Sequence, residues 1–350
     1  MFSSALRATL VALVFAATAS AKTGLSLSLS GPSAVDSVGA LHVTATLVNT
    51  GDVELKLVND PRTILSAFET NSFDITDAEG KSPRFTGALV KYSPEQIAAA
   101  DDAADFTVLA PGASVEIVHD ISKAYNFTTS GASTYDIVAA NKLQYVAADG
   151  SLATIYAEAA GGMHTAAISG ELAIARRSNL GKRATYNGCS SSRQTALASA
   201  ATSAQTYASG AVTYLTAATS STTRYTTWFG TWTSSRRSTV LSHYTNIANQ
   251  GYTSYTYDCT CTDSSYAYVY PDDFGTIYLC NAFWSAPNTG TDSRAGTLIH
   301  ESTHFTRLAG TDDYAYGQSA AKSLAISNPS NAIFNADSHE YFAENNPVLA

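Results

Sequence analysis

The stretch His300-Glu301-Ser302-Thr303-His304 constrains this chain more than any other segment. Two histidines four residues apart lie on the same face of an α-helix, one turn from each other. Both imidazoles can therefore reach one metal ion, and Glu301 can address a water molecule beside that ion. The HExxH pattern supplies two zinc ligands and a general base, so we expect a helix that carries a catalytic Zn2+ site.

The flanking residues favour a helix over a chance match. Ser293 or Asp292 can cap its N-terminus, and Gly310 stands where a left-handed C-terminal cap belongs. A catalytic zinc also needs a third protein ligand. The extended HExxHxxGxxH pattern is absent, because Arg307 replaces its glycine and Gly310 its third histidine. A glutamate about twenty residues further on, as in thermolysin-like enzymes, is missing too.

The segment that follows is Gly310-Thr311-Asp312-Asp313-Tyr314-Ala315-Tyr316-Gly317. It resembles the GTxDxxYG motif of the deuterolysin-like metallopeptidases, the aspzincins. That resemblance implies one zinc ion held by His300, His304 and Asp313, with Glu301 as the general base. It also makes Tyr316 a phenol that can hydrogen-bond the oxyanion. Asp312 is the neighbouring alternative, but the motif places the ligand at Asp313.

The first residues predict export. Arg7 precedes an apolar stretch from Leu10 to Ala17, and Ala19-Ser20-Ala21 offers a small-residue cleavage site, so residues 1–21 are expected to be a signal peptide. The apolar stretch is too short to span a bilayer. We therefore expect a secreted, extracellular protein that has no membrane partner.

Composition narrows the function classes. The chain has 350 residues, of which 14% are charged, and a net charge of −9. Low charge with ample apolar content argues against disorder, and the length suggests about two domains. The acidic balance argues against nucleic acid or an anionic membrane surface as a partner.

Residues 22 to about 175 show the alternation of apolar and polar positions that is typical of strands. We expect strands at 25–29, 41–47, 55–58, 106–109, 115–118, 134–139 and 172–175. Short strands at such spacing suggest an immunoglobulin-like sandwich without the inter-sheet disulfide, because this half has no cysteine. Asn126-Phe127-Thr128 is a glycosylation sequon. The histidines of this half have no ligand spacing and are interpreted as structural.

Two dibasic pairs, Arg176-Arg177 and Lys182-Arg183, mark a boundary. Exposed linkers of this kind are where chains are cut, and Lys182-Arg183 before Ala184 looks like a kexin-type processing site, although ordinary surface pairs are an alternative. We interpret residues 22–183 as a propeptide and 184–350 as the mature enzyme. The propeptide would cover the cleft or assist folding until export.

All four cysteines, Cys189, Cys259, Cys261 and Cys280, lie in the second half. In an exported domain they predict two disulfides rather than a zinc site. Cys259 and Cys261 are too close to pair, which leaves two connectivities. The family resemblance favours Cys189–Cys259 with Cys261–Cys280.

The expected fold class is α+β: a zincin-like, mainly helical catalytic domain with a small antiparallel sheet, preceded by an all-β sandwich pro-domain. Helices are expected at 193–215, around 240–244 with Ser234 or Ser235 as cap, at 318–327 and at 329–345. Tyr266–Tyr270 and Thr276–Leu279 flank a turn and predict a hairpin. Its strand is our candidate for holding the substrate backbone by β-augmentation.

Specificity depends on Asp337 and Glu340, which share one helix face. A solvated acidic face is the simpler interpretation, and His339-Glu340 as metal ligands is a third. Residues 185–189, 300–317 and 335–347 closely resemble the fungal peptidyl-Lys metalloendopeptidases. In that resemblance the two carboxylates bind the lysine after the cut bond. Only Lys322 lies beyond residue 183, against seven lysines before it.

The predicted function is a zinc metalloendopeptidase that is secreted as a monomeric zymogen. It would cut protein or peptide substrates on the amino side of lysine. Its other partners would be its own propeptide and a kexin-type processing protease. A deuterolysin-type protease of broad specificity is one alternative. A non-enzymatic exported binding or cell-wall protein with an incidental HExxH is the other.

Overall fold

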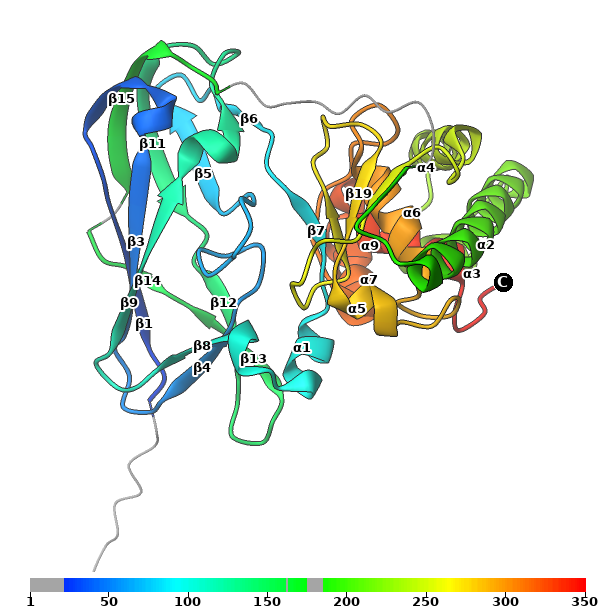
Figure 1. The fold of residues 1–350 in the computed structure, drawn as a ribbon, viewed down its shortest axis with the longest axis horizontal. Coiled ribbons are helices and arrows are strands. Elements are labelled where there is room, and N and C mark those ends of the chain that lie inside the picture. Colours follow the sequence, from blue (N-terminus) through cyan, green and yellow to red (C-terminus); the bar gives the residue numbers. More distant parts are fainter. Residues whose placement is uncertain (1–21, 162, 175–184) are drawn as a thin grey trace, which may run out of the picture.

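The computed structural model describes residues 22–161, 163–174 and 185–350, which form two halves (Figure 1). The architecture is mixed α+β, with most strands in the N-terminal half and most helices in the C-terminal half. The expected signal peptide and the dibasic pairs, including Lys182-Arg183, lie outside the described residues. Within the described ranges, no helix is both long and apolar enough to cross a bilayer.

In the part of the N-terminal half that the structure describes, there are three four-stranded sheets and one two-stranded sheet. The first sheet has the order β14 (Glu158–Ala159), β1 (Leu25–Ser30), β3 (His42–Asn49), β9 (Ser114–Asp120). The second has the order β2 (Ala34–Ser37), β15 (His164–Glu171), β11 (Ser133–Ala139), β5 (Phe73–Asp77). The third has the order β13 (Leu152–Tyr156), β12 (Lys142–Val146), β4 (Leu55–Val58), β8 (Phe106–Leu109), and β10 (Tyr125–Asn126) pairs with β6 (Arg84–Phe85).

Alternating burial along these strands explains why the sequence pattern predicted most of them. In β3, Val43, Ala45 and Leu47 are fully buried while the residues between them are partly exposed. The strand expected at 172–175 is wrong, because the pairing residues come earlier, in β15, and residues 172–174 are not a strand. This half also holds the short helix α1 (Pro94–Ala100), capped by Ser93, which the strand pattern did not predict.

Over residues 185–350, the C-terminal half combines eight α-helices with one small sheet. The helices are α2 (Ser191–Ala217), α3 (Thr223–Phe229), α4 (Ser234–Gln250), α5 (Asn281–Ser285), α6 (Arg294–His304), α7 (Gly317–Ser327), α8 (Pro329–Ala332) and α9 (Ala336–Glu344). The sheet has the order β16 (Thr185–Asn187), β17 (Thr256–Asp258), β19 (Thr276–Leu279), β18 (Ala267–Val269) and β7 (Leu89–Lys91).

The sheet corrects the expected fold class in one respect. It is mixed rather than antiparallel, because β16, β17 and β19 pair in parallel, whereas β18 is antiparallel to both of its neighbours, β19 and β7. Parallel neighbours need long connections, and the chain between β16 and β17 supplies one through three helices. The predicted hairpin of β18 and β19 is confirmed.

Two helix predictions also need correction. The side chain that caps α4 belongs to Thr233, whose oxygen accepts from the backbone N–H of Arg236, rather than to Ser234 or Ser235. The single helix expected over 329–345 is split into α8 and α9. The break occurs because Asn335 forms a β-bridge with Asp312 and its Oδ1 accepts from Ala315 N at 3.0 Å.

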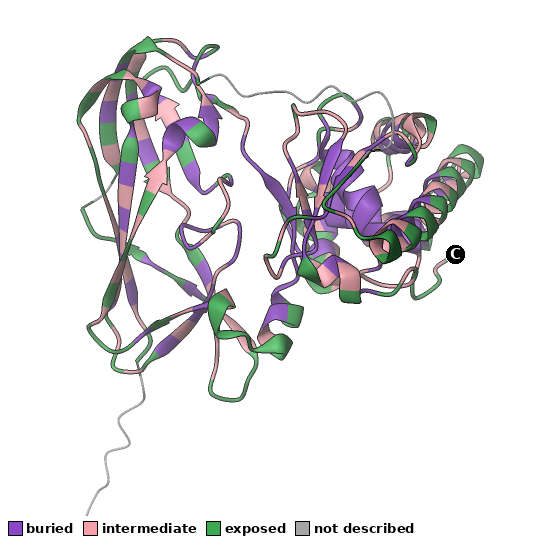
Figure 2. Cartoon of the chain, viewed as in Figure 1, coloured by how far each residue is buried: buried purple, intermediate pink, exposed green. Residues whose placement is uncertain are grey.

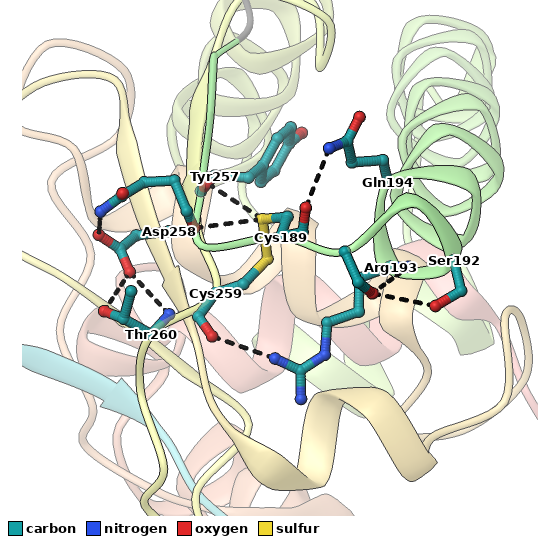
Figure 3. Close-up of a disulfide and its surroundings, with 10 residues drawn as sticks. Cys189, Ser192, Arg193, Gln194, Tyr257, Asp258, Cys259 and Thr260 are labelled. Atoms are coloured by element: carbon teal, nitrogen blue, oxygen red, sulfur yellow. Dashed lines mark hydrogen bonds between the residues drawn. A yellow bond between two sulfur atoms is a disulfide. The ribbon is translucent and has the colours of Figure 1, made fainter.

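The disulfides are Cys189–Cys259 and Cys261–Cys280, the connectivity that the resemblance favoured. Cys189–Cys259 joins the start of α2 to the end of β17 (Figure 3). Around it, Arg193 Nη1 donates to the carbonyl oxygen of Cys259 at 3.1 Å, and Gln194 Nε2 donates to that of Cys189 at 2.9 Å. These contacts fasten the first long helix to the sheet.

The strand β7 connects the two halves. It belongs to the N-terminal half in sequence but is the edge strand of the C-terminal sheet, paired with β18 (Figure 1). Its three residues are buried where the halves meet (Figure 2). A small apolar cluster beside it, which includes Tyr92 and Tyr316, also draws on both halves.

Candidate metal centre and active site

The helix α6 forms where the HExxH motif predicted it. Its N-cap is Ser293, whose side chain accepts from Gly296 N at 2.9 Å. All its residues from Ala295 to His304 are buried. The helix ends at His304, earlier than expected. Gly310 has the left-handed φ of 59° but lies in the following loop, so it does not cap the helix.

The loop after α6 folds back toward the two histidines. Its return begins with Thr311, whose N–H donates to the carbonyl oxygen of Thr303 at 3.1 Å. Asp312 then pairs with Asn335 at the start of α9. This bridge turns the next side chain, Asp313, inward toward α6.

The three expected metal ligands lie together. Asp313 Oδ1 is 3.2 Å from His300 Nε2 and 3.4 Å from His304 Nε2. All three side chains are buried, and one ligand atom from each lies within 4.8 Å of the others. The Oδ1 atom of Asp313 and both Nε2 atoms have no hydrogen-bond partner. Buried polar atoms without hydrogen-bond partners destabilise a fold, so these three atoms point to a ligand at this position. Two imidazoles and one carboxylate are a donor set that fits Zn2+.

The far side of each imidazole is held by a second group. His304 Nδ1 lies 3.0 Å from the carbonyl oxygen of Thr311, and His300 Nδ1 lies 2.8 Å from Asp337 Oδ1. Such partners fix the ring orientation and leave Nε2 free for a metal. Asp337 therefore has a structural role toward His300 that the sequence did not suggest.

The electrostatics suit a metal site with a nearby base. Burial disfavours the charge of Asp313, but His304 and His300 outweigh it and hold the pKa of Asp313 far below its usual value. Asp313 is thus ionised, as a metal ligand must be. Burial raises the pKa of Glu301 to about 7, with the two histidines opposing the shift. A carboxylate in that range can both take and return a proton near neutral pH.

Glu301 and Tyr316 face the same peptide bond from two sides. Glu301 Oε1 accepts from the backbone N–H of Lys91 at 3.1 Å, and its Oε2 is buried without a partner. The Tyr316 hydroxyl donates to the carbonyl oxygen of Val90 at 2.7 Å. Burial raises the pKa of Tyr316 far above its usual value, so it is a neutral donor.

Asp337 and Glu340 line an acidic pocket next to His300 and do not form a solvated face. Both are fully buried on α9. The pocket holds the Lys91 ammonium, whose Nζ lies 3.0 Å from Asp337 Oδ1 and 2.9 Å from Glu340 Oε2. A third carboxylate, Asp292, lies 3.0 Å from the same nitrogen.

Several residues around Lys91 could not be predicted from the sequence. Asp292 was considered only as a helix cap, yet its Oδ1 contacts Lys91 and accepts from the hydroxyl of Tyr341 at 2.7 Å. The ring of Tyr341 lies 5.1 Å from Lys91 Nζ, close enough for a cation–π contact. A signal for Asp292 was available, since it immediately precedes the predicted helix, but nothing local linked it to α9 or to residue 91.

His339 is not a metal ligand. Its Nε2 lies 3.0 Å from His243 Nδ1, and its Nδ1 lies 3.0 Å from the carbonyl oxygen of Asn335. Both histidines are buried on the far side of α9 among aromatic rings. They form a structural pair rather than a site.

Comparison with known proteins places the chain in a family. Residues 214–344 match the model of the aspzincin M35 family, described as lysine-specific metallo-endopeptidase. The peptidyl-Lys metalloendopeptidase of Armillaria mellea is 59% identical over 99% of both chains. The chain belongs to the aspzincin family. It is accordingly a zinc-dependent metalloendopeptidase, a hydrolase of peptide bonds.

Two further proteins match about half of the chain. The peptidyl-Lys metalloendopeptidase of Pleurotus ostreatus is 65% identical over 48% of this chain and the whole of that protein. A solved structure of a zinc peptidase from Grifola frondosa is 61% identical, with a TM-score of 0.46, and covers 46% of this chain and all of that one.

Proposed function

We propose that this aspzincin is a secreted zinc endopeptidase, made as a zymogen, that hydrolyses the peptide bond on the amino side of lysine. The observation that carries the proposal is the pocket beside His300. There the ammonium of Lys91 is fully buried within 3.0 Å of Asp292, Asp337 and Glu340. A buried ammonium needs such partners, and a pocket built this way excludes apolar and acidic side chains.

The proposed roles follow the geometry. His300, His304 and Asp313 hold the zinc ion, which when bound acidifies a water molecule and polarises the peptide carbonyl. Glu301 takes a proton from the attacking water and passes it to the departing amine. Its contact with the backbone N–H of Lys91 supports this role. Tyr316 donates a hydrogen bond to the carbonyl oxygen as that oxygen gains charge.

Lysine recognition combines charge and fit. Burial opposes the charge on Lys91, but Asp337 and Glu340 outweigh it and hold the pKa of Lys91 well above its usual value. A lysine is thus bound as the cation. We expect arginine to fit less well, because its planar guanidinium is larger than the ammonium that three converging carboxylates surround here.

The zymogen part of the proposal divides the chain into a signal peptide (1–21), a propeptide (22–183) and the enzyme (184–350). We propose a β-sandwich-like fold for the propeptide, supported by its three four-stranded sheets. A kexin-type protease would cut after Lys182-Arg183. The complete match of the shorter relative to about half of this chain supports such an independent enzyme. We further propose that the mature enzyme is a monomer acting outside the cell.

The experiment that tests the function is a map of the bonds cut in one denatured protein by the activated enzyme. Cuts confined to Xaa–Lys bonds support the proposal, whereas cuts without regard to lysine favour the broad deuterolysin-type alternative. The Glu301→Gln variant is the matched control. It should bind zinc normally and cut nothing, and near-normal digestion of casein by it would exclude Glu301 as the base.

A further inference from the structure

The strand β7 is bound to the C-terminal half in the way that a peptide substrate binds a protease. It adds to the edge strand β18 in antiparallel register, with Lys91 opposite Ala267 and Val90 opposite Tyr268. The backbone N–H of Tyr266 donates to the carbonyl oxygen of Lys91 at 3.0 Å. Edge-strand addition of this kind holds the backbone of a peptide and leaves its side chains to select pockets.

The side chain of Lys91 occupies the acidic pocket formed by Asp292, Asp337 and Glu340. Among the lysines in the described ranges, Lys91 alone is buried. Its partners Asp292, Asp337 and Glu340 all come from the other half of the chain, at least 201 residues away in sequence. Stability of the fold does not explain a buried lysine at this position. An apolar residue of similar volume would stabilise the folded chain as well as a buried ion pair does, or better.

Backbone atoms of Val90 and Lys91 form hydrogen bonds with three residues of the proposed catalytic site. The carbonyl oxygen of Val90 accepts from the hydroxyl of Tyr316 at 2.7 Å. The N–H of Lys91, which is the amine side of the same peptide bond, donates to Glu301 at 3.1 Å. The N–H of Val90 donates to Asp313 Oδ2 at 3.0 Å. Oxyanion donor, base and ligand carboxylate therefore converge on the Val90–Lys91 bond.

We propose that β7 is an internal substrate: it closes the active site by filling the lysine pocket, and its Val90–Lys91 bond is the first bond that the enzyme cuts in itself. This inference rests on the proposed function. In the step, the oxygen of water bonds to the carbonyl carbon of Val90 and the C–N bond breaks. One proton of the water passes through Glu301 to the nitrogen of Lys91, and the other is lost from the new carboxyl group to the new amine. The products are a carboxylate on Val90 and an ammonium on Lys91.

Both sides of this bond are anchored, which makes the cut slow and its products slow to leave. On one side, Ala88 N donates to the carbonyl oxygen of Glu69 at 2.8 Å. On the other, the side chain of Ser93 caps helix α1. Arg62, also from the N-terminal half, lies 4.3 Å from the ring centre of Tyr316. We therefore expect a lag before full activity rather than immediate self-digestion.

The test follows the purified zinc-loaded chain 22–350 over time by mass spectrometry and N-terminal sequencing, while a short Xaa–Lys peptide reports activity. In the wild type, a new N-terminus at Lys91 should appear, and its growth should match the end of the lag. The Glu301→Gln chain should show no new terminus. The Lys91→Ala chain should lack this terminus and begin with an initial rate about ten-fold higher than that of the wild type, because the pocket is empty.

The matched control is Lys81→Ala, which removes an exposed lysine of the same half and should behave as the wild type. Circular dichroism and thermal melts check that each variant folds, and Lys91→Gln replaces Lys91→Ala if the latter does not. The wild-type terminus needs no substitution at all. Lysine-directed cutting of casein with an intact Val90–Lys91 bond would overturn this inference alone. Failure to cut casein at lysine would overturn the proposed function.

Discussion

The acidic pocket permits a quantitative prediction about specificity. Glu340→Gln removes a fully buried carboxylate that lies 2.9 Å from the lysine nitrogen. A hydrogen bond to a charged group contributes about 1.5–3 kcal/mol, so kcat/KM for an Xaa–Lys peptide should fall by about 10- to 150-fold. Asp292→Asn should lower kcat/KM for the same peptide by about ten-fold at most, because the side chain of Asp292 is 25% exposed and solvent screens its charge.

The assay compares kcat/KM for two peptides that differ only in lysine or glutamine after the cut bond. Glu340→Gln should lower the value for the lysine peptide and leave that for the glutamine peptide nearly unchanged, because glutamine carries no charge for Glu340 to neutralise. Asp272→Asn, which removes one charge from an exposed side chain of the same half, is the control. If Glu340→Gln keeps the lysine-to-glutamine ratio within about three-fold of the wild type, the pocket assignment is wrong.

Three other predictions address the oxyanion donor, the buried histidines and one disulfide. Tyr316→Phe should lower kcat by about 100-fold or more with little change in KM, and an unchanged kcat in steady-state assays would exclude the donor role. Burial lowers the pKa of His243 to about 4 and of His339 to about 3, so their contribution to stability is complete above pH 6.5 and is lost as pH falls below it. The free energy of unfolding in urea should fall by about 4 kcal/mol between pH 8 and pH 5 because of this pair. In His243→Gln the fall should be about half as large. An equal fall in both proteins would contradict the assignment. Replacing Cys261 and Cys280 by alanine should lower the free energy of unfolding by about 3 kcal/mol, since the bond closes a loop of 19 residues, and an unchanged urea midpoint would count against this.

The zinc-site helix could be predicted because its signal is local. A helix repeats every 3.6 residues, so the four-residue spacing of His300 and His304 fixes their common face before any tertiary contact forms. The Ser293 cap depends on the same short range. The end of the helix could not be predicted in the same way, because Gly310 supplies a left-handed residue whether or not the helix reaches it.

The strands were predictable where one face is buried and one exposed, as in β3, and less so where edges or bulges decide the pairing. The sheet of the C-terminal half was expected to be antiparallel because its hairpin is the local signal. Its parallel pairs join segments separated by whole helices, and no short pattern records them.

The sequence alone determined the chemistry that this chain can perform, because two imidazoles, a base and a returning carboxylate are set by spacings within about fifteen residues. Only the tertiary structure decided which distant residues lie around the metal ligands and the lysine pocket. Asp292 joins the lysine pocket from before α6, Asp337 also holds His300, and Lys91 enters the pocket from the other half. Contacts across 200 residues depend on how two folded halves dock, and residue spacing carries no information about that.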